Sequence, residues 1–128
     1  MHLTKEMEEN IFIEADAMRL EQVIANFLNN ALTHMDEKKE LRITLKKSGQ
    51  RACFGIINSG RPIPEEEMEK IWTSFYKIDS ARTREDGGSG LGLSIVKSIL
   101  DAHDSKYGVN NQEDGVEFWF EMSRKESD

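Results

Sequence analysis

The sequence predicts an α+β fold with two layers, in which helices cover one face of a mixed, mostly antiparallel sheet. Two long segments, residues 17–35 and 91–103, repeat apolar residues at the spacing of an α-helix. The remaining apolar segments alternate with polar residues, as half-buried strands do, and short turns join them into hairpins. A sheet of this kind has one apolar face, which the two helices cover. With 128 residues, one domain spanning residues 1–128 and one hydrophobic core are expected.

The first helix follows a polar beginning. Residues 1–9 are polar and are expected to be frayed, whereas the apolar run in residues 10–14 predicts a short strand. Asp16 is the expected N-cap, because its carboxylate can accept backbone N–H groups of the first turn. The helix then covers residues 17–35, and its apolar face consists of Leu20, Val23, Ile24, Phe27, Leu28, Ala31 and Met35.

The next segments supply a hairpin and a connection. Residues 41–46 alternate apolar and polar side chains, and residues 52–58 form a second strand after the turn at residues 48–50. Residues 59–64 break regular structure, and a short helix follows that begins at Pro64 and ends near Trp72.

The last third of the chain holds a long loop, the second helix and two strands. Residues 77–90 lack apolar periodicity, and a loop of this length in a compact domain is usually functional or disordered. After the helix at residues 91–103, residues 106–110 predict a strand. The last strand begins at Gly115, where apolar and polar side chains alternate up to Met122.

Composition excludes several classes of function. The net charge of -7 argues against nucleic-acid binding and against docking on anionic membranes, both of which need basic surfaces. The longest nearly apolar stretch, residues 52–57, is too short to cross a bilayer, and the first residues do not form a signal peptide. Cys53 is the single cysteine, which rules out an internal disulfide and favours a reducing, cytoplasmic setting.

A polar stripe on the first helix is the first candidate site. Its members, three or four residues apart, are Arg19, Gln22, Asn26, Asn30 and Thr33. Asparagine is a poor helix former, so two of them one turn apart are locally unfavourable. The stripe either faces solvent or presents amide oxygens to a polar ligand or a hydrated cation. A neutral amide oxygen holds Mg²⁺ well only together with phosphate oxygens.

Two glycine-containing motifs complete the set of candidates. In residues 58–63, Gly60 allows a ligand to approach the backbone, and the Asn58 amide at a strand end can pair with a base edge. In residues 88–93, glycines precede a helix, whose free N–H groups suit phosphate. Each motif alone is equally compatible with an ordinary turn. The second is neither a Walker loop nor a dinucleotide fingerprint.

Taken together, the order and placement of the motifs resemble the catalytic and ATP-binding domain of two-component sensor histidine kinases. The resemblance covers residues 11–122. Residues 26–31 resemble the asparagine box of that family, 58–63 the first glycine box, 71–77 the phenylalanine box, and 88–93, followed by Ser94-Ile95-Val96-Lys97, the second glycine box. The resemblance implies the Bergerat (GHKL-type) fold, whose left-handed βαβ unit binds ATP, also in gyrase-type and mismatch-repair ATPases.

The resemblance also implies roles for single residues. Asn30 would bind Mg²⁺, Asn26 would lie against the phosphates, and Asn58 would accept a hydrogen bond from the adenine amine. Residues 77–89 would form a lid over the nucleotide. The ATP-binding residues implied in this way are Asn26, Asn30, Asn58, Gly60, Ile63, Phe75, Tyr76, Lys77, Arg82, Gly88, Ser89, Gly90, Leu91, Gly92 and Leu93. No catalytic side chain is assigned.

The chain departs from the family pattern at several positions. Asn58 replaces the usual aspartate, Pro62 replaces the second glycine of the first glycine box, and Thr33 stands where a basic residue is common. One positive charge directed at the phosphates is therefore missing. Mg²⁺ and the cations of the lid would have to neutralise more of the phosphate charge. We expect these changes to affect the affinity for ATP.

The phosphate acceptor of the family is missing from this sequence. The family phosphorylates a histidine that is followed by an acidic residue and then a proline, and none of His2, His34 and His103 has this context. The resemblance therefore implies a histidine kinase module that is inactive without its acceptor domain. Its partners would be a histidine-bearing dimerisation domain of the same protein and a response regulator. The module would be the cytoplasmic part of a membrane-anchored sensor. Two alternatives remain: a serine kinase of the anti-sigma type, and a nucleotide-sensing interaction module without turnover.

Overall fold

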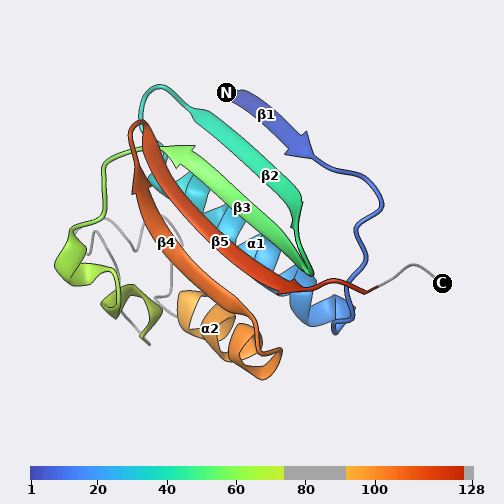
Figure 1. Cartoon of the computed structure of the whole chain (residues 1–128). Coiled ribbons are helices and arrows are strands. Elements are labelled where there is room, and N and C mark those ends of the chain that lie inside the picture. The colour runs from blue at the N-terminus through green and yellow to red at the C-terminus, as the bar shows by residue number, and fades with distance from the viewer. Residues whose placement is uncertain (74–91, 126–128) are drawn as a thin grey trace.

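The structure, a computed structural model, describes residues 1–73 and 92–125 (Figure 1). The elements are, in chain order, β1 (His2–Met7), α1 (Ala17–His34), β2 (Glu40–Ser48), β3 (Arg51–Ser59), the 3₁₀ turns η1 (Glu65–Glu67) and η2 (Lys70–Trp72), α2 (Gly92–Ala102), β4 (Lys106–Gln112) and β5 (Gly115–Ser123). The strands form one sheet in the order β1-β2-β3-β5-β4. β1 is parallel to β2, and the other neighbours are antiparallel.

Helices α1 and α2 lie on the same face of the sheet, and none of the helices in residues 1–73 and 92–125 lies on the opposite face (Figure 1). Alternate residues of β3 and β5 therefore point toward α1 and α2, and their side chains form the core. This arrangement confirms the two-layer α+β fold and the hairpin of β2 and β3. None of the described helices is both long and apolar enough to cross a bilayer.

Helix α1 is the central support of the core. Asp16 caps it, since the carboxylate oxygen Oδ1 accepts hydrogen bonds from the backbone of Met18 at 3.1 Å and Arg19 at 3.2 Å. The Phe27 side chain is fully buried, and its ring lies 5.5 Å from that of Phe118 and 6.4 Å from that of Trp72. The predicted cap is thus confirmed, and the helix ends one residue earlier than expected.

His103 joins the ends of the two helices. The backbone N–H of Asp16 donates to His103 Nε2 at 3.2 Å, and His103 Nδ1 lies 2.8 Å from the carbonyl oxygen of Ile99. Both ring nitrogens are therefore used within the fold, in the tautomer that carries its proton on Nδ1. This supports a structural role for His103.

Three expectations from the sequence are wrong in detail. Residues 2–7 are not frayed but form strand β1, whose backbone pairs with β2 although all six side chains are exposed. Residues 10–14 do not form a strand, and only an isolated bridge joins Ile13 to Arg124. The segment between Pro64 and Trp72 forms two 3₁₀ turns instead of one helix, because so short a segment gains little from α-helical bonds.

Candidate functional site

The polar stripe of α1 meets the start of α2. Asn26 Nδ2 donates to the carbonyl oxygen of Gln22 at 2.9 Å, which leaves Asn26 Oδ1 as the free end of the amide. A Cβ atom added to Gly92 would lie 3.1 Å from this oxygen. Gly92 therefore allows the first residue of α2 to approach Asn26 closely. Asn26 of the stripe and Gly92 of the second glycine box, which are far apart in the sequence, come together at this contact.

Asn30 lies on the same helix, one turn beyond Asn26, and is half-buried. Within residues 1–73 and 92–125, the structure records no hydrogen bond of the Asn30 side chain. The neighbouring Asn29 is exposed. Asn30 is therefore the less exposed of these two neighbouring amides.

The first glycine box holds a buried amide at the end of β3. The side chain of Asn58 is almost fully buried, with 2% of the residue exposed. Asn58 Nδ2 donates to the carbonyl oxygen of Ser59 at 3.0 Å. This hydrogen bond uses the donor group of the amide and leaves Oδ1 as the acceptor that Asn58 can present to a ligand.

Gly60 brings this box against the end of α1. A Cβ atom at Gly60 would lie 2.7 Å from the carbonyl oxygen of His34 and 3.0 Å from Asn58 Nδ2. Only glycine permits the loop to pass this close to the helix backbone. Asn30 therefore lies on α1 about one turn from each of two contacts, Asn26 with Gly92 and His34 with Gly60.

Ser59 ties the same loop to the connection between α1 and β2. Its carbonyl oxygen accepts the backbone N–H of Asp36, and its hydroxyl oxygen accepts that of Glu40, both at 3.0 Å. A hydrogen bond with the Ser59 side chain lowers the pKa of the Asp36 carboxyl. The position of Asn58 is thus set by a buried polar network.

Asn111, which our sequence analysis did not select, holds Ile63 in place. Its Oδ1 accepts the backbone N–H of Ile63 at 2.8 Å, and its Nδ2 donates to the Ile63 carbonyl at 2.9 Å. The Ile63 side chain is buried at 4% exposure. Asparagines before a turn are common, so the sequence carried no sign that this one spans 48 residues to a loop.

We predict that Asn111→Ala lowers the free energy of unfolding by about 2 kcal/mol, because two hydrogen bonds to a part-buried backbone segment are lost. The matched control is Asn110→Ala, since the neighbouring Asn110 is exposed and its amide, whose nitrogen donates to the carbonyl oxygen of Val109 and whose oxygen accepts from Trp119 Nε1, bonds only within β4 and β5. Urea titration measures both effects. Equal losses in the two variants would contradict the role of Asn111.

A polar cluster fixes α2 against β4. Lys97 Nζ lies 2.7 Å from Asp101 Oδ2, and the Tyr107 hydroxyl donates to Asp101 Oδ1 at 2.9 Å. The bond from Lys97, supported by the one from Tyr107, lowers the pKa of the Asp101 carboxyl. The Tyr107 ring meets Trp72 edge-on, with centroids 5.0 Å apart. These contacts hold Trp72 and helix α2 to the same strand, β4.

The structure brings together part of the predicted site. Asn26 meets Gly92, Asn58 meets Gly60, and Asn30 lies between these contacts along α1. Leu93 is half-buried and packs against the core. Phe75, Tyr76, Lys77, Arg82, Gly88, Ser89, Gly90 and Leu91, together with the predicted lid at residues 77–89, lie outside the described residues.

The fold and this site place the chain in a known family. The model of the histidine kinase-, DNA gyrase B- and HSP90-like ATPases matches residues 15–126, and the chain belongs to this family. The probable sensor kinase SilS of Salmonella typhimurium is 34% identical over 116 residues, which cover 89% of this chain and 23% of that protein. The sensor protein kinase WalK of Staphylococcus haemolyticus is 36% identical over 107 residues, covering 82% and 18%.

Solved structures agree with the sequence comparison. The nucleotide-free catalytic domain of the histidine kinase ThkA has a TM-score of 0.83 at 34% identity, covering 96% of this chain and 78% of that one. Full-length ShkA in complex with AMPPNP has a TM-score of 0.83 at 26% identity, covering 98% and 26%. The fold is that of histidine kinase catalytic domains. The chain spans about a fifth of the length of the curated sensor kinases.

Proposed function

We propose that this chain binds Mg·ATP and provides its terminal phosphoryl group to a histidine on a separate dimerisation domain. The observation that carries the proposal is the position of Asn30 on α1 between two close approaches, one to Gly92 and one to Gly60. Asn26 and Asn30 of the stripe, together with Gly60 and Gly92, therefore border one side of the same helix. Such a convergence is what a ligand with a base at one end and phosphates at the other requires.

The chemistry of each described residue fits a part of the nucleotide. Asn58 has its donor group engaged by Ser59, so its Oδ1 accepts from the amine of adenine. Gly60 leaves the loop without a side chain at its approach to α1, and Ile63 supplies a buried apolar neighbour. Gly92 begins an eleven-residue helix, whose first N–H groups favour phosphate oxygens.

Asn26 and Asn30 would hold the metal end of the ligand. Oxygen donors suit Mg²⁺, and a neutral amide needs phosphate oxygens to complete the coordination shell. Because Gly92 has no side chain, no Cβ atom crowds Asn26 Oδ1 where α2 begins. When bound, the ion neutralises charge on the phosphates, while these residues bind and orient the nucleotide. We assign no general base to the chain.

The partners follow from the relatives. ThkA has been solved in complex with the response regulator TrrA, at 34% identity to this chain. By analogy, we infer a dimerisation domain bearing the acceptor histidine, a response regulator as the second partner, and a cytoplasmic location in a membrane-anchored sensor. We infer contact of this domain with neither nucleic acid nor membrane.

We expect Mg·ATP to raise the melting temperature of the chain, because a ligand that binds only the folded state stabilises it. At a hundredfold excess over the dissociation constant the gain is about 2.7 kcal/mol. The control is a purine riboside triphosphate without the 6-amino group, which we expect to bind more weakly if Asn58 accepts from that amine. Absence of any shift with ATP would refute the proposal.

Phosphoryl transfer is tested separately, with a histidine-bearing acceptor domain and labelled ATP. An acid-labile product is expected, as phosphohistidine is. An acid-stable product would point to a serine kinase. Binding of ATP without transfer to the acceptor domain of the same protein would point to a nucleotide-sensing module.

A further inference from the structure

The described residues that we assign to the nucleotide carry no charge. Asn26, Asn30 and Asn58 present amides, whereas Gly60 and Gly92 have no side chain. Mg·ATP remains an anion, because one magnesium ion neutralises only part of the charge of the triphosphate. In a chain whose net charge is -7, binding such an anion requires a cation close to the site.

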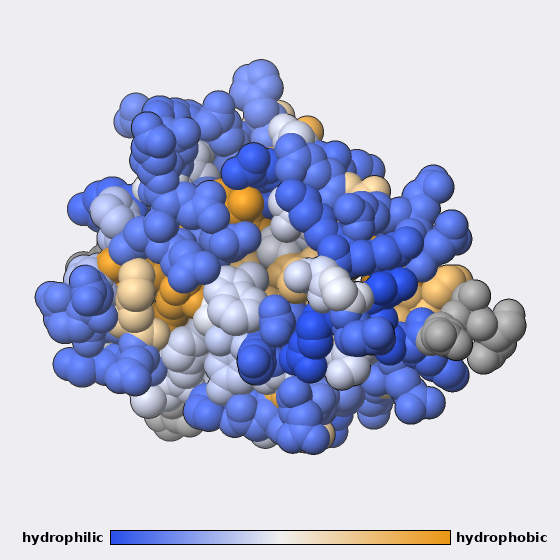
Figure 2. Space-filling view, in the orientation of Figure 1, coloured by the Kyte–Doolittle hydropathy of each residue, from blue (hydrophilic) through white to orange (hydrophobic). Residues whose placement is uncertain are grey.

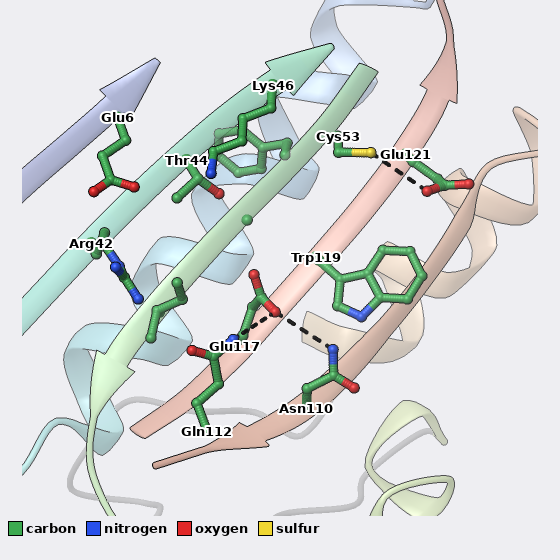
Figure 3. A pocket seen from close by; sticks show the side chains of 13 residues that line it. Glu6, Arg42, Thr44, Lys46, Cys53, Asn110, Gln112, Glu117, Trp119 and Glu121 are labelled. Atoms are coloured by element: carbon green, nitrogen blue, oxygen red, sulfur yellow. Dashed lines mark hydrogen bonds between the residues drawn. The ribbon is translucent and has the colours of Figure 1, made fainter. Parts of the chain in front are cut away.

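Two basic side chains of β2 point away from this site. The apolar residues that alternate with Arg42 and Lys46 along the strand belong to the core and its surroundings. Arg42 and Lys46 therefore point to the face of the sheet opposite α1 (Figure 3). Figure 2 shows this face, whose surface is largely hydrophilic. The sheet itself separates these two cations from Asn26 and Asn30.

Other cations are too distant or are held by carboxylates. Arg19 belongs to the polar stripe but lies eleven residues before Asn30, about 17 Å along α1. Lys97 Nζ lies 2.7 Å from Asp101 Oδ2. Arg51 lies at the start of β3, about 23 Å along the strand from Asn58, and its guanidinium is 3.3 Å from a carboxylate oxygen.

Arg61 is a cation beside the contact between the first glycine box and α1. It directly follows Gly60, where an added Cβ atom would lie 2.7 Å from the carbonyl oxygen of His34. Consecutive Cα atoms are about 3.8 Å apart, so the backbone of Arg61 is also close to the last turn of α1. Asn30 lies four residues before His34, about 6 Å along the helix. An extended arginine side chain spans such a distance.

The backbone on both sides of Arg61 is held in place. Ser59 is hydrogen-bonded to the connection between α1 and β2, and Ile63 is buried and makes two hydrogen bonds to Asn111. A proline restricts the residue before it to an extended conformation, so Pro62 limits the backbone of Arg61 as well. Arg61 itself is exposed, and a ligand can therefore reach it.

We propose that Arg61 is a phosphate-binding residue of the nucleotide site, an assignment that rests on the proposed function. Its guanidinium presents paired N–H donors, which match two oxygens of a phosphate group. Arg61 lies between Asn58, assigned to the base, and Asn30, assigned to the metal. Its partner is therefore a phosphate near the ribose, which ADP carries as well as ATP. The restricted loop presents this charge at a small cost in entropy.

Thr33 explains why the loop has to supply the charge. Thr33 lies three residues after Asn30, so its side chain is on the same side of α1. A cation at this position would reach the same phosphates, but threonine carries none. Arg61 approaches the same turn of the helix from the loop and supplies the positive charge that the stripe lacks there.

A role of Arg61 in the fold alone would give different results. A cation near the C-terminal end of a helix stabilises it through the carbonyl groups of the last turn. In that case, replacing Arg61 would lower the stability of the chain. The affinities for nucleotides with phosphates and for the nucleoside without them would then change to the same extent.

The test compares Arg61→Gln with the wild type, because glutamine is polar but carries no charge. Calorimetry measures the dissociation constants of Mg·ATP and Mg·ADP, and the shift in melting temperature measures binding of millimolar adenosine. Arg61→Gln should weaken binding of both Mg·ATP and Mg·ADP about tenfold, since a charge-assisted hydrogen bond is lost. Binding of adenosine and the midpoint of urea unfolding should not change.

Lys38→Gln is the matched control. Lys38 is exposed in the turn that follows α1, so the substitution removes the same charge close to the same end of the helix. Its affinity for Mg·ATP should stay within about twofold of the wild type, because exposed charges are screened at a distance. A loss as large as that of Arg61→Gln would show a general effect of charge and contradict the assignment.

A second substitution tests whether the charge can be moved to α1. In the double variant Thr33→Lys with Arg61→Gln, the cation lies one turn from Asn30 on the helix instead of on the loop. We expect this variant to regain most of the tenfold loss in affinity for Mg·ATP. A double variant that binds Mg·ATP no better than Arg61→Gln would contradict the proposal.

The outcomes separate this proposal from the one on which it rests. A wild-type chain that binds no Mg·ATP would refute the proposed function, and with it the role of Arg61. If the wild type binds Mg·ATP and Arg61→Gln binds it equally well, only the role of Arg61 is wrong. An equal loss for adenosine and Mg·ATP would show that Arg61 acts through the loop and not on the phosphates.

Discussion

Replacing Gly115 with alanine is expected to lower the free energy of unfolding by about 3 kcal/mol, the largest effect of a single methyl group that we foresee. Gly115 is the first residue of β5 and pairs with Ser59 at the end of β3. A Cβ atom there would lie 2.0 Å from the carbonyl oxygen of Asn58 and 2.8 Å from its carbonyl carbon. Both are backbone atoms, so a change of rotamer cannot relieve the contact, and the strands must separate.

The same displacement should weaken binding of ATP, because it moves Asn58 and the loop of Gly60. Urea titration measures the loss of stability, and a titration with Mg·ATP measures the loss of affinity in the fraction that remains folded.

Gly49→Ala is the matched control for this substitution. Gly49 has a φ of +59°, and nothing lies within 4 Å of the position of an added Cβ atom. Alanine at this position costs only the strain of the left-handed conformation, about 1 kcal/mol. The position is far from Asn58. A Gly115→Ala protein that is no less stable than Gly49→Ala would show that β5 can move freely at its start.

Side-chain periodicity explains which elements were predictable. Helix α1 and the hairpin of β2 and β3 were anticipated within one or two residues, since each buries one side of a regular pattern. Strand β1 was missed because its six side chains are all exposed. Its stability derives from backbone hydrogen bonds to β2, which leave no trace in the pattern of apolar residues.

The candidate site was predictable to a similar extent. Asn26, Asn30, Asn58 and Gly60 stand out because amides inside a helix and glycines beside a strand are locally unfavourable. Asn111 and Gly115 support the same loop but lie in an ordinary turn region, and their contacts with Ile63 and Asn58 depend on tertiary structure. The roles of the residues between 74 and 91 stay predictions.

Asn30→Ala is expected to remove the dependence of ATP binding on Mg²⁺ while leaving the fold almost unchanged. Asn30 is half-buried without a side-chain hydrogen bond in the described part of the chain, so its removal breaks no hydrogen bond recorded there. Alanine is also the better helix former, by a few tenths to about 0.7 kcal/mol. A loss of Mg²⁺ dependence would therefore reflect a lost ligand and not a damaged helix.

Asn29→Ala is the control for that experiment, because it makes the same chemical change one position away on the exposed side of α1. Melting temperatures are recorded for both variants with ATP, in the presence of Mg²⁺ and of a chelator. For Asn29→Ala, as for the wild type, Mg²⁺ should increase the shift that ATP produces. For Asn30→Ala the two shifts should coincide. If Mg²⁺ still increases the shift in Asn30→Ala, the ion is held by the phosphates and by other residues, and the assignment of Asn30 as its ligand is wrong.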